Sequence, residues 1–281
     1  MKVACTGRSR ALGARIAEYL GAGVVETNLS RFPDGEIYLR IGPLDETTVV
    51  VGSLLSSDSL VELLLLIDAC HRSEVLLVIP YLGYARQDRE FKPGEPVSAR
   101  AMAQALSHGV SRVVTVNVHK ESVLSHFTVP ASQVSLAREV GDFIAGLDLE
   151  NPLILAPDMG AVPFATVVAS RGGWELDHLE KTRISGEEVR VEPRKGGPWT
   201  DEVVLVDDII STGGTLATAA RMLRAQGAKG VHAVCVHGLF AGTALTLLRS
   251  AGIGQIAASD TIEGPNSLYS AAGPIGKALS R

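Results

Sequence analysis

Short apolar runs alternate with helix-period segments along most of the chain, and this alternation constrains the fold more than any other feature. The run TTVVVG (47–52) is followed by SDSLVELLLLIDACHR (57–72) and then by EVLLVIPYL (74–82). In the second half, EVVLV (202–206) leads through a loop to TLATAARMLRAQGAKG (215–230). Parallel strands joined by crossover helices produce this pattern, so we predict an α/β fold with mainly parallel sheets flanked by helices.

The alternation begins a second time near the middle of the chain. After LDLENP (147–152), which is rich in turn-forming residues, PLILAPD (152–158) starts a new series. A chain of 281 residues is long enough for two medium-sized cores. We therefore predict two domains, residues 1–148 and residues 149–281.

The composition argues against several partners and locations. The formal net charge is −5 and no long run of Lys and Arg occurs, so we expect no nucleic-acid partner. The most apolar window contains Glu62 and Asp68, which argues against a membrane span. The three cysteines are far apart in apolar surroundings, as expected in a reducing compartment. Because the N-terminus also lacks a basic region followed by an apolar run, we expect a cytoplasmic protein.

The segment VDDIISTGGT (206–215) carries the most specific chemistry. Two carboxylates directly follow an apolar run, and a Ser/Thr/Gly loop then opens a helix that we expect Thr215 to cap. Adjacent glycines permit close backbone approach, while free amides at a helix N-terminus attract an anion. The candidate binding residues are Asp207, Asp208, Ser211, Thr212, Gly213, Gly214 and Thr215. Since the ATP-binding P-loop pattern is absent, we predict a site for a phosphorylated sugar; the alternative is an Asp-rich turn that only caps a helix.

Three further motifs follow apolar runs. RQDR (86–89) offers guanidinium groups that suit a polyphosphate. His119 ends RVVTVNVH, where an imidazole can meet a metal ion or a phosphate. Asp158 follows PLILAP and has the carboxylate oxygens that Mg²⁺ prefers. Each motif also has a plainer interpretation: RQDR as a solvated turn, His119 as a hydrogen-bonded histidine at a strand end, and Asp158 as a helix cap.

Two more segments stand outside the alternation. RFPDGEIYLRI (31–41) sets acidic residues around a Pro-Gly turn, which alone is an ordinary β-turn. The charged stretch 174–202 suggests a protruding hairpin or flap, in which Lys181 and Arg183 share one side if the chain is extended. A solvated charged hairpin is the alternative.

These motifs, in this order, resemble those of ribose-phosphate diphosphokinases. The loop at 206–215 is similar to the phosphoribosyl-diphosphate loop of the type I phosphoribosyltransferase fold, which base-salvage transferases share. The motifs that match the diphosphokinases are FPDGE (32–36), RQDR (86–89), His119, PDMG (157–160), KTR (181–183) and HGLF (237–240). The segment EFKPGEPVSAR (90–100) is most similar to archaeal-type members. The resemblance implies two phosphoribosyltransferase-like domains in tandem, the first on the ATP side and the second carrying the ribose 5-phosphate loop and the flap.

The resemblance also implies residue roles. Lys181 and Arg183 would be the catalytic pair that closes over the transferring diphosphoryl group. ATP would be bound by Phe32, Asp34, Glu36, Arg86, Gln87, Asp88 and His119. The first three would contact the adenine of ATP bound by a neighbouring subunit, so a homo-oligomer, at least a dimer, is expected. Mg²⁺ is the expected cofactor, held by His119 and Asp158; Asn117 stands where many members have aspartate.

The implied reaction transfers the diphosphoryl group of ATP to O1 of ribose 5-phosphate, giving 5-phosphoribosyl 1-diphosphate and AMP. A non-catalytic, nucleotide-binding regulatory paralogue is one alternative, and Asn117 gives it some support. A base phosphoribosyltransferase is the other, and the ATP-side motifs count against it.

Overall fold

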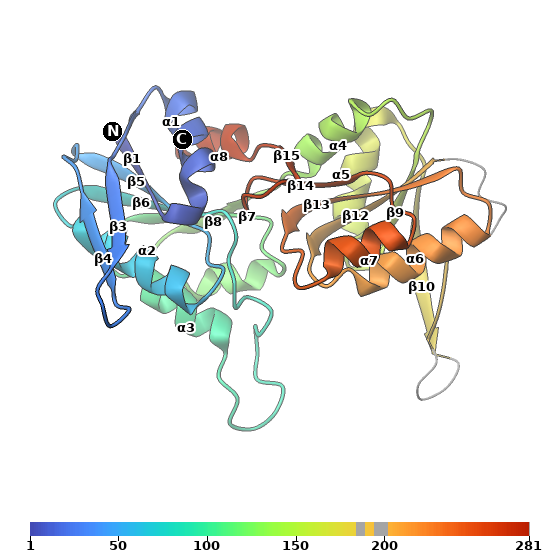
Figure 1. Cartoon of the computed structure of the whole chain (residues 1–281). Helices are drawn as coiled ribbons and strands as arrows, with labels where there is room; N and C mark the ends of the chain where they lie inside the picture. Colours follow the sequence, from blue (N-terminus) through green and yellow to red (C-terminus); the bar gives the residue numbers. More distant parts are fainter. Residues whose placement is uncertain (184–188, 194–201, 281) are drawn as a thin grey trace. The chain divides into compact units, whose positions relative to one another are not determined.

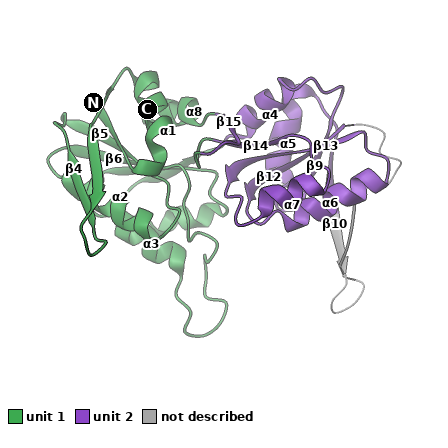
Figure 2. Cartoon of the chain, viewed as in Figure 1, with its two compact units in different colours: residues 1–135, 260–263, 270–281 green, residues 136–259, 264–269 purple. Residues whose placement is uncertain are grey.

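The computed structural model describes residues 1–183, 189–193 and 202–280. The chain divides into two compact units, which Figure 2 shows in different colours. Unit 1 comprises Met1–Ser135, Asp260–Glu263 and Ser270–Arg281, and unit 2 comprises Leu136–Ser259 and Gly264–Tyr269. The division that we expected between residues 148 and 149 falls inside unit 2, where helix α4 (Ala137–Ala145) packs against helix α5 (Val162–Gly172).

Unit 1 is built on a parallel sheet with the strand order β2-β1-β5-β6-β7-β8. These strands are β1 (Lys2–Cys5), β2 (Gly23–Val24), β5 (Thr47–Val51), β6 (Glu74–Ile79), β7 (Arg112–Val116) and β8 (Ala131–Val134). The helices are α1 (Arg10–Leu20), α2 (Ser57–Ala69), α3 (Ser98–Leu106) and α8 (Ala272–Leu279), with short 3-10 turns η1 (Gly7–Ser9) and η2 (Glu121–His126). Figure 1 shows α1 and α8 on one face of the sheet and α2 and α3 on the other. An antiparallel hairpin of β3 (Thr27–Arg31) and β4 (Ile37–Ile41) packs against α2.

The central elements of unit 1 follow from their residues. The valines 49–51 of β5 are fully buried, as expected for a strand covered by helices on both faces. Helix α2 begins at a capping box, in which the hydroxyl groups of Ser56 and Ser59 each accept a hydrogen bond from the backbone N–H of the other residue. Because all neighbouring strands of this sheet are parallel, the loops that follow them lie at the same edge, the carboxyl edge.

Unit 2 contains a second sheet with the order β11-β10-β9-β12-β13-β14-β15. Its strands are β9 (Leu153–Ala156), β10 (Leu176–Arg183), β11 (Val189–Pro193), β12 (Glu202–Ile210), β13 (Gly230–Gly238), β14 (Ile256–Ser259) and β15 (Ser267–Tyr269). All neighbouring strands are parallel except β10 and β11, whose antiparallel pairing agrees with the hairpin expected in this region. Besides α4 and α5, the unit contains the helices α6 (Gly214–Ala225) and α7 (Ala244–Ser250). The predicted α/β class, with two mainly parallel sheets flanked by helices, is confirmed.

The C-terminal segments of unit 1 are held by a buried carboxylate. Asp260 is 2% exposed and accepts hydrogen bonds from Nη1 of Arg15 at 2.7 Å and from the backbone N–H of Ala271 at 2.7 Å. The hydroxyl group of Ser270 donates a third at 2.6 Å. These bonds tie the segments around residues 260 and 270 to α1.

In the described part of the chain, no helix combines the length and the apolar character needed to span a bilayer.

Candidate functional site

The predicted acidic pair lies within a strand and not in the loop after it. Strand β12 continues to Ile210, because Asp207 pairs with Cys235 and Ile210 pairs with Gly238 in β13. Asp208 donates its backbone N–H to Oδ1 of Asp207 at 2.8 Å. The strand therefore fixes both half-buried aspartates at the carboxyl edge of the sheet.

The loop after β12 encloses a hollow of about 160 Å³. The residues that line it are Asp207, Ile209, Ile210, Ser211, Thr212, Gly213, Gly214, Thr215 and Leu216. Gly213, with φ of 75°, is the N-cap of α6, so the helix begins at the hollow with its first backbone N–H groups. The predicted residues 211–215 are therefore brought together. The apolar lining residues were not predicted, because an apolar side chain gives no chemical signal in the sequence.

Negative charge accumulates beside this hollow. Burial raises the pKa of Asp207 above its ordinary value, and the charge of Asp208 raises it further. The charge of Asp158 acts in the same direction, so these three carboxylates of unit 2 lie close enough to interact. Such a group favours the approach of a cation or of hydroxyl donors.

Asp158 follows β9 on an exposed turn. Its Oδ1 accepts hydrogen bonds from the backbone N–H groups of Gly160 at 2.9 Å and Ala161 at 3.2 Å, just before α5. Asp158 therefore orders the turn before α5, but it is not the helix cap of the plainer interpretation, because the N-cap of α5 is Ala161. Since both bonds use Oδ1, the carboxylate can order the turn and still present Oδ2.

The two predicted metal ligands belong to different units, with His119 in unit 1 and Asp158 in unit 2. Within the residues that the structure describes, three or more His, Cys, Asp or Glu side chains nowhere gather into a preformed metal-binding group. His119 itself is exposed, three residues beyond the end of β7.

The turn between β3 and β4 presents the residues predicted to contact adenine. The backbone N–H of Phe32 donates to the carbonyl of Glu36 at 2.9 Å, and that of Glu36 donates to Oδ1 of Asp34 at 3.2 Å. The ring of Phe32 packs edge-on against Tyr38 with 5.5 Å between the centroids, and the residue is 49% exposed. The turn thus holds an aromatic face and two exposed carboxylates in a fixed arrangement.

The loop between β6 and α3 carries the other predicted ATP residues. Arg86 is exposed, but the amide of Gln87 is already engaged, accepting from Oγ of Ser98 at 3.2 Å and donating to Glu95 at 3.4 Å. The ammonium group of Lys120 lies 2.7 Å from Oδ2 of Asp88 and lowers the pKa of that carboxyl group. Sequence reasoning missed Lys120, although a cation directly after the strand-end histidine was a possible signal.

Lys181 and Arg183 lie on β10, where their backbones pair with Val191 and Val189 of β11. Their side chains are outside the part of the chain that the structure describes.

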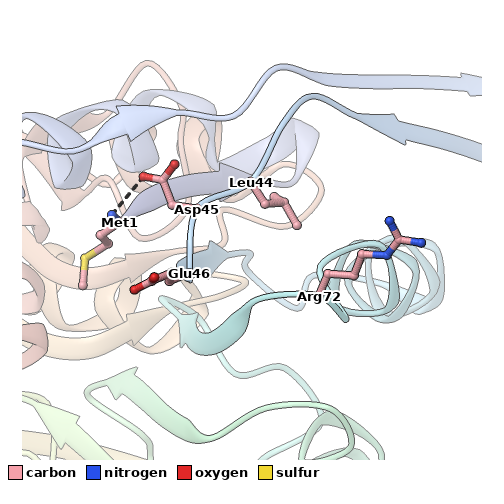
Figure 3. A pocket seen from close by; sticks show the side chains of 5 residues that line it. All are labelled: Met1, Leu44, Asp45, Glu46 and Arg72. Atoms are coloured by element: carbon pink, nitrogen blue, oxygen red, sulfur yellow. Dashed lines mark hydrogen bonds and ion pairs between the residues drawn. The ribbon is translucent and has the colours of Figure 1, made fainter.

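A larger hollow, of about 740 Å³, lies at the edge of the unit 1 sheet where strands β1, β5 and β6 begin. Figure 3 shows the side chains that line it: Met1, Leu44, Asp45, Glu46 and Arg72. The N-terminal ammonium group pairs with Asp45 at 3.0 Å. These residues precede β1, β5 and β6, and none of them is a predicted site residue.

Comparisons with known proteins agree along the whole chain. The model of the N-terminal domain of ribose phosphate pyrophosphokinase matches residues 1–109, and the phosphoribosyl transferase domain matches residues 132–252. The chain is 45% identical over 284 residues to the ribose-phosphate pyrophosphokinase of Methanosarcina acetivorans, with 100% of both chains covered. It is 43% identical to that of Methanopyrus kandleri, covering 99% of this chain and 98% of the relative.

A solved structure gives the same result for the fold. The phosphoribosylpyrophosphate synthetase from Mycobacterium smegmatis superposes with a TM-score of 0.85 at 27% identity, covering 99% of this chain and 97% of that one. The resemblance stated from the motifs, including its archaeal type, is confirmed by these matches. The chain belongs to the ribose-phosphate pyrophosphokinase family, also called the ribose-phosphate diphosphokinases.

Proposed function

We propose that the protein transfers the diphosphoryl group of ATP to O1 of ribose 5-phosphate, giving 5-phosphoribosyl 1-diphosphate and AMP. The observation that carries this proposal is the hollow at the start of α6, where helix amides and hydroxyl groups meet the carboxylate of Asp207. An anion fits the amides and a polyol fits the carboxylate, so a sugar phosphate meets both conditions. The full-length similarity to ribose-phosphate pyrophosphokinases supports the same substrate.

Ribose 5-phosphate binds through both parts of this hollow. The 5-phosphate accepts hydrogen bonds from the backbone of 211–215 and from the hydroxyl groups of Ser211, Thr212 and Thr215. The ribose hydroxyls donate to Asp207, which lines the hollow, and to Asp208, the next residue of β12. Binding thereby orients O1 toward ATP.

ATP binds on the unit 1 side. Phe32 stacks on the adenine of ATP in a neighbouring subunit, where Asp34 and Glu36 accept from its amino group. Arg86 pairs with phosphate oxygens, while Gln87 and Asp88 shape the loop. Because the adenine is shared between subunits, this arrangement requires a homo-oligomer, at least a dimer. We also propose that the protein is cytoplasmic.

Mg²⁺ fits the chemistry of the donor groups. Burial, and then the charges of Asp208 and Asp158, raise the pKa of Asp207, and a cation would relieve the repulsion among these three carboxylates. We assign Asp158 and His119 to the ion, with Asn117 offering only an amide oxygen. When bound, Mg²⁺ would neutralise charge on the phosphate oxygens, which otherwise repel the attacking oxygen.

In the reaction, the bond from O1 to the β-phosphorus forms while the bond from that phosphorus to the oxygen bridging it to the α-phosphorus breaks. AMP leaves with that oxygen, and the proton of the O1 hydroxyl passes to solvent. Lys181 and Arg183 stabilise charge on the transferring group, and closure of their segment excludes water. Catalysis therefore depends on positioning and charge neutralisation, without a strong general base.

Formation of AMP tests the proposal. Purified protein is mixed with ATP, Mg²⁺ and ribose 5-phosphate, each component is omitted in turn, and AMP is quantified by chromatography. We expect AMP only in the complete mixture. The variant Lys181→Ala should lower kcat by roughly 10²–10³ if the ammonium acts as a preorganised electrostatic donor.

Other outcomes identify the alternatives. ATP binding without turnover would indicate the regulatory paralogue, and Asn117→Asp would then be the first variant to assay. Consumption of phosphoribosyl diphosphate in the presence of a nucleobase, without AMP formation from ATP, would indicate a base phosphoribosyltransferase.

A further inference from the structure

The contact between Lys120 and Asp88 joins two loops at the carboxyl edge of the unit 1 sheet. Nζ of Lys120 lies 2.7 Å from Oδ2 of Asp88. The side chain of Asp88 is only 10% exposed, whereas that of Lys120 is 46% exposed. Oδ1 of Asp88 is buried and finds no hydrogen-bond partner within the described residues. A carboxylate so far removed from water needs a compensating charge, and Lys120 provides it.

The backbone that carries Lys120 is held to the neighbouring strand. The N–H of Asn117 donates to the carbonyl of Val134 at 3.0 Å, and the N–H of Val118 donates to Oε1 of Gln133 at 3.0 Å. The carbonyl of Lys120 accepts from the N–H of Val123 at 3.1 Å, which starts η2. Lys120 therefore projects from a fixed point next to His119.

The loop that carries Asp88 is braced on its other side. The carbonyl of Gln87 accepts from the N–H of Ala99 at 3.2 Å, which fixes the loop to the start of α3. Farther along, Oε2 of Glu95 accepts from the N–H groups of Phe91 at 3.1 Å and Lys92 at 3.2 Å. Gln87 thus attaches the base of the loop to α3, and Asp88 attaches it to the loop after β7.

We propose that Lys120 is a positioning residue for ATP, acting through Asp88; this rests on the proposed function. Lys120 holds Asp88 in place, and with it the exposed Arg86 and Arg89 that flank it in the chain. It also neutralises a carboxylate located where the polyphosphate binds. Without Lys120, the charge of Asp88 would repel ATP, and the loop would lose the attachment that Asp88 makes to the loop after β7.

Four variants test this mechanism: Lys120→Met, Lys120→Arg, Asp88→Asn and the double variant Lys120→Met/Asp88→Asn. The Michaelis constant for ATP should rise about tenfold in Lys120→Met, the effect of losing one partly buried charge pair. The values of kcat and of the Michaelis constant for ribose 5-phosphate should stay within about twofold, because the other loop and hollow are untouched. Lys120→Arg should keep the Michaelis constant for ATP near that of the unsubstituted protein, since a guanidinium also pairs with a carboxylate.

The double variant separates an action through Asp88 from a direct contact with ATP. If Lys120 acts through Asp88, the double variant should bind ATP better than Lys120→Met, because no unpaired carboxylate remains. A direct contact predicts the same loss on removing Lys120 whether residue 88 is Asp or Asn, and that result would overturn the proposal. So would an unchanged Michaelis constant in Lys120→Met.

A matched control is Lys2→Met, which removes another Lys–Asp contact of unit 1 at the amino edge of the sheet. Lys2→Met should leave the Michaelis constant for ATP unchanged. A rise equal to that of Lys120→Met would contradict a specific role for Lys120. Thermal unfolding of each variant identifies any general loss of folding.

Product formation by the unsubstituted protein is measured first, so that failure of the proposed function is recognised separately. If no product forms, calorimetric affinities of the same variants for ATP with Mg²⁺ decide the inference, with the same expected order. Absence of ATP binding by the unsubstituted protein would overturn both.

Discussion

Gly213 lies directly against Leu248 at the start of α6. A Cβ atom built on Gly213 would stand 3.0 Å from Cγ of Leu248, and φ of Gly213 is 75°, in the left-handed region. Helix α7 thus packs beneath the loop that surrounds the hollow, at a point where the backbone itself has little space. Residue 213 must therefore be glycine for both steric and conformational reasons.

The variant Gly213→Ala should lower the free energy of unfolding by about 1–3 kcal/mol, because it strains a left-handed residue and crowds Leu248. It should also raise the Michaelis constant for ribose 5-phosphate, since the loop must shift. Gly214→Ala is the matched control for stability, because a Cβ there meets no atom within 4 Å. Urea unfolding of both variants checks the difference, and equal stabilities would contradict the packing argument.

The carboxylates beside the hollow predict an unusual pH dependence. Burial, and then the charge of Asp208, raises the pKa of Asp207, so the folded state favours its neutral form. The resulting stabilisation is fully present below the ordinary aspartate pKa of about 4 and is lost as the pH rises through the raised value.

The variant Asp207→Asn carries a side chain that is neutral at every pH, so it should gain stability relative to the unsubstituted protein as the pH rises. Unfolding by urea without Mg²⁺, repeated across this range, measures the difference. A difference that does not change with pH would show that Asp207 ionises normally. The same variant should bind ribose 5-phosphate less tightly, because an NH₂ group that cannot accept a hydrogen bond replaces one of the two carboxyl oxygens.

The cysteines should be inert in the folded protein. Burial raises the pKa of Cys5 to about 12 and that of Cys70 to about 11, and burial raises the pKa of Cys235 as well. Because the thiolate is the reactive form, Ellman's reagent should react with none of the three native thiols at neutral pH. In denaturant, all three should react. Rapid labelling of the native protein would contradict this assignment.

Removing the carboxylate of Asp260 should destabilise unit 1. Asp260→Ala leaves the donors of Ser270 and Ala271 without their acceptor, so a loss of about 3 kcal/mol is expected. Asp45→Ala is the control, since Asp45 is 40% exposed and such pairs contribute about 1 kcal/mol or less. Denaturant unfolding compares the two, and equal losses would argue against an anchoring role for Asp260.

The fold class was predictable because short apolar runs alternate regularly with helix-period segments. The end of β12 was not, since Asp207 and Asp208 look like loop residues until β13 supplies the pairing that extends the strand to Ile210. The predicted start of α6 was wrong as well, because the backbone conformation of Gly213 is not visible in the sequence. We expected Thr215 as the cap, but the left-handed Gly213 begins the helix earlier.

Contacts between distant residues were also beyond sequence reasoning. Lys120 and Asp88 are separated by 32 positions, and only the parallel order of β6 and β7 brings their loops together. The return of the C-terminal segments to unit 1 depends likewise on Asp260 meeting Arg15 from a point 245 residues away. The motif residues of the hollow, by contrast, are consecutive, so their gathering required only one strand, one turn and one helix.

The most direct test of the central claim is ³¹P NMR of the products formed from ATP, Mg²⁺ and ribose 5-phosphate. Transfer of an intact diphosphoryl group predicts AMP and 5-phosphoribosyl 1-diphosphate in equal amounts, with two coupled phosphorus resonances from the new diphosphate and one from the 5-phosphate. Formation of ADP together with a singly phosphorylated O1, or hydrolysis of ATP that does not depend on ribose 5-phosphate, would contradict it.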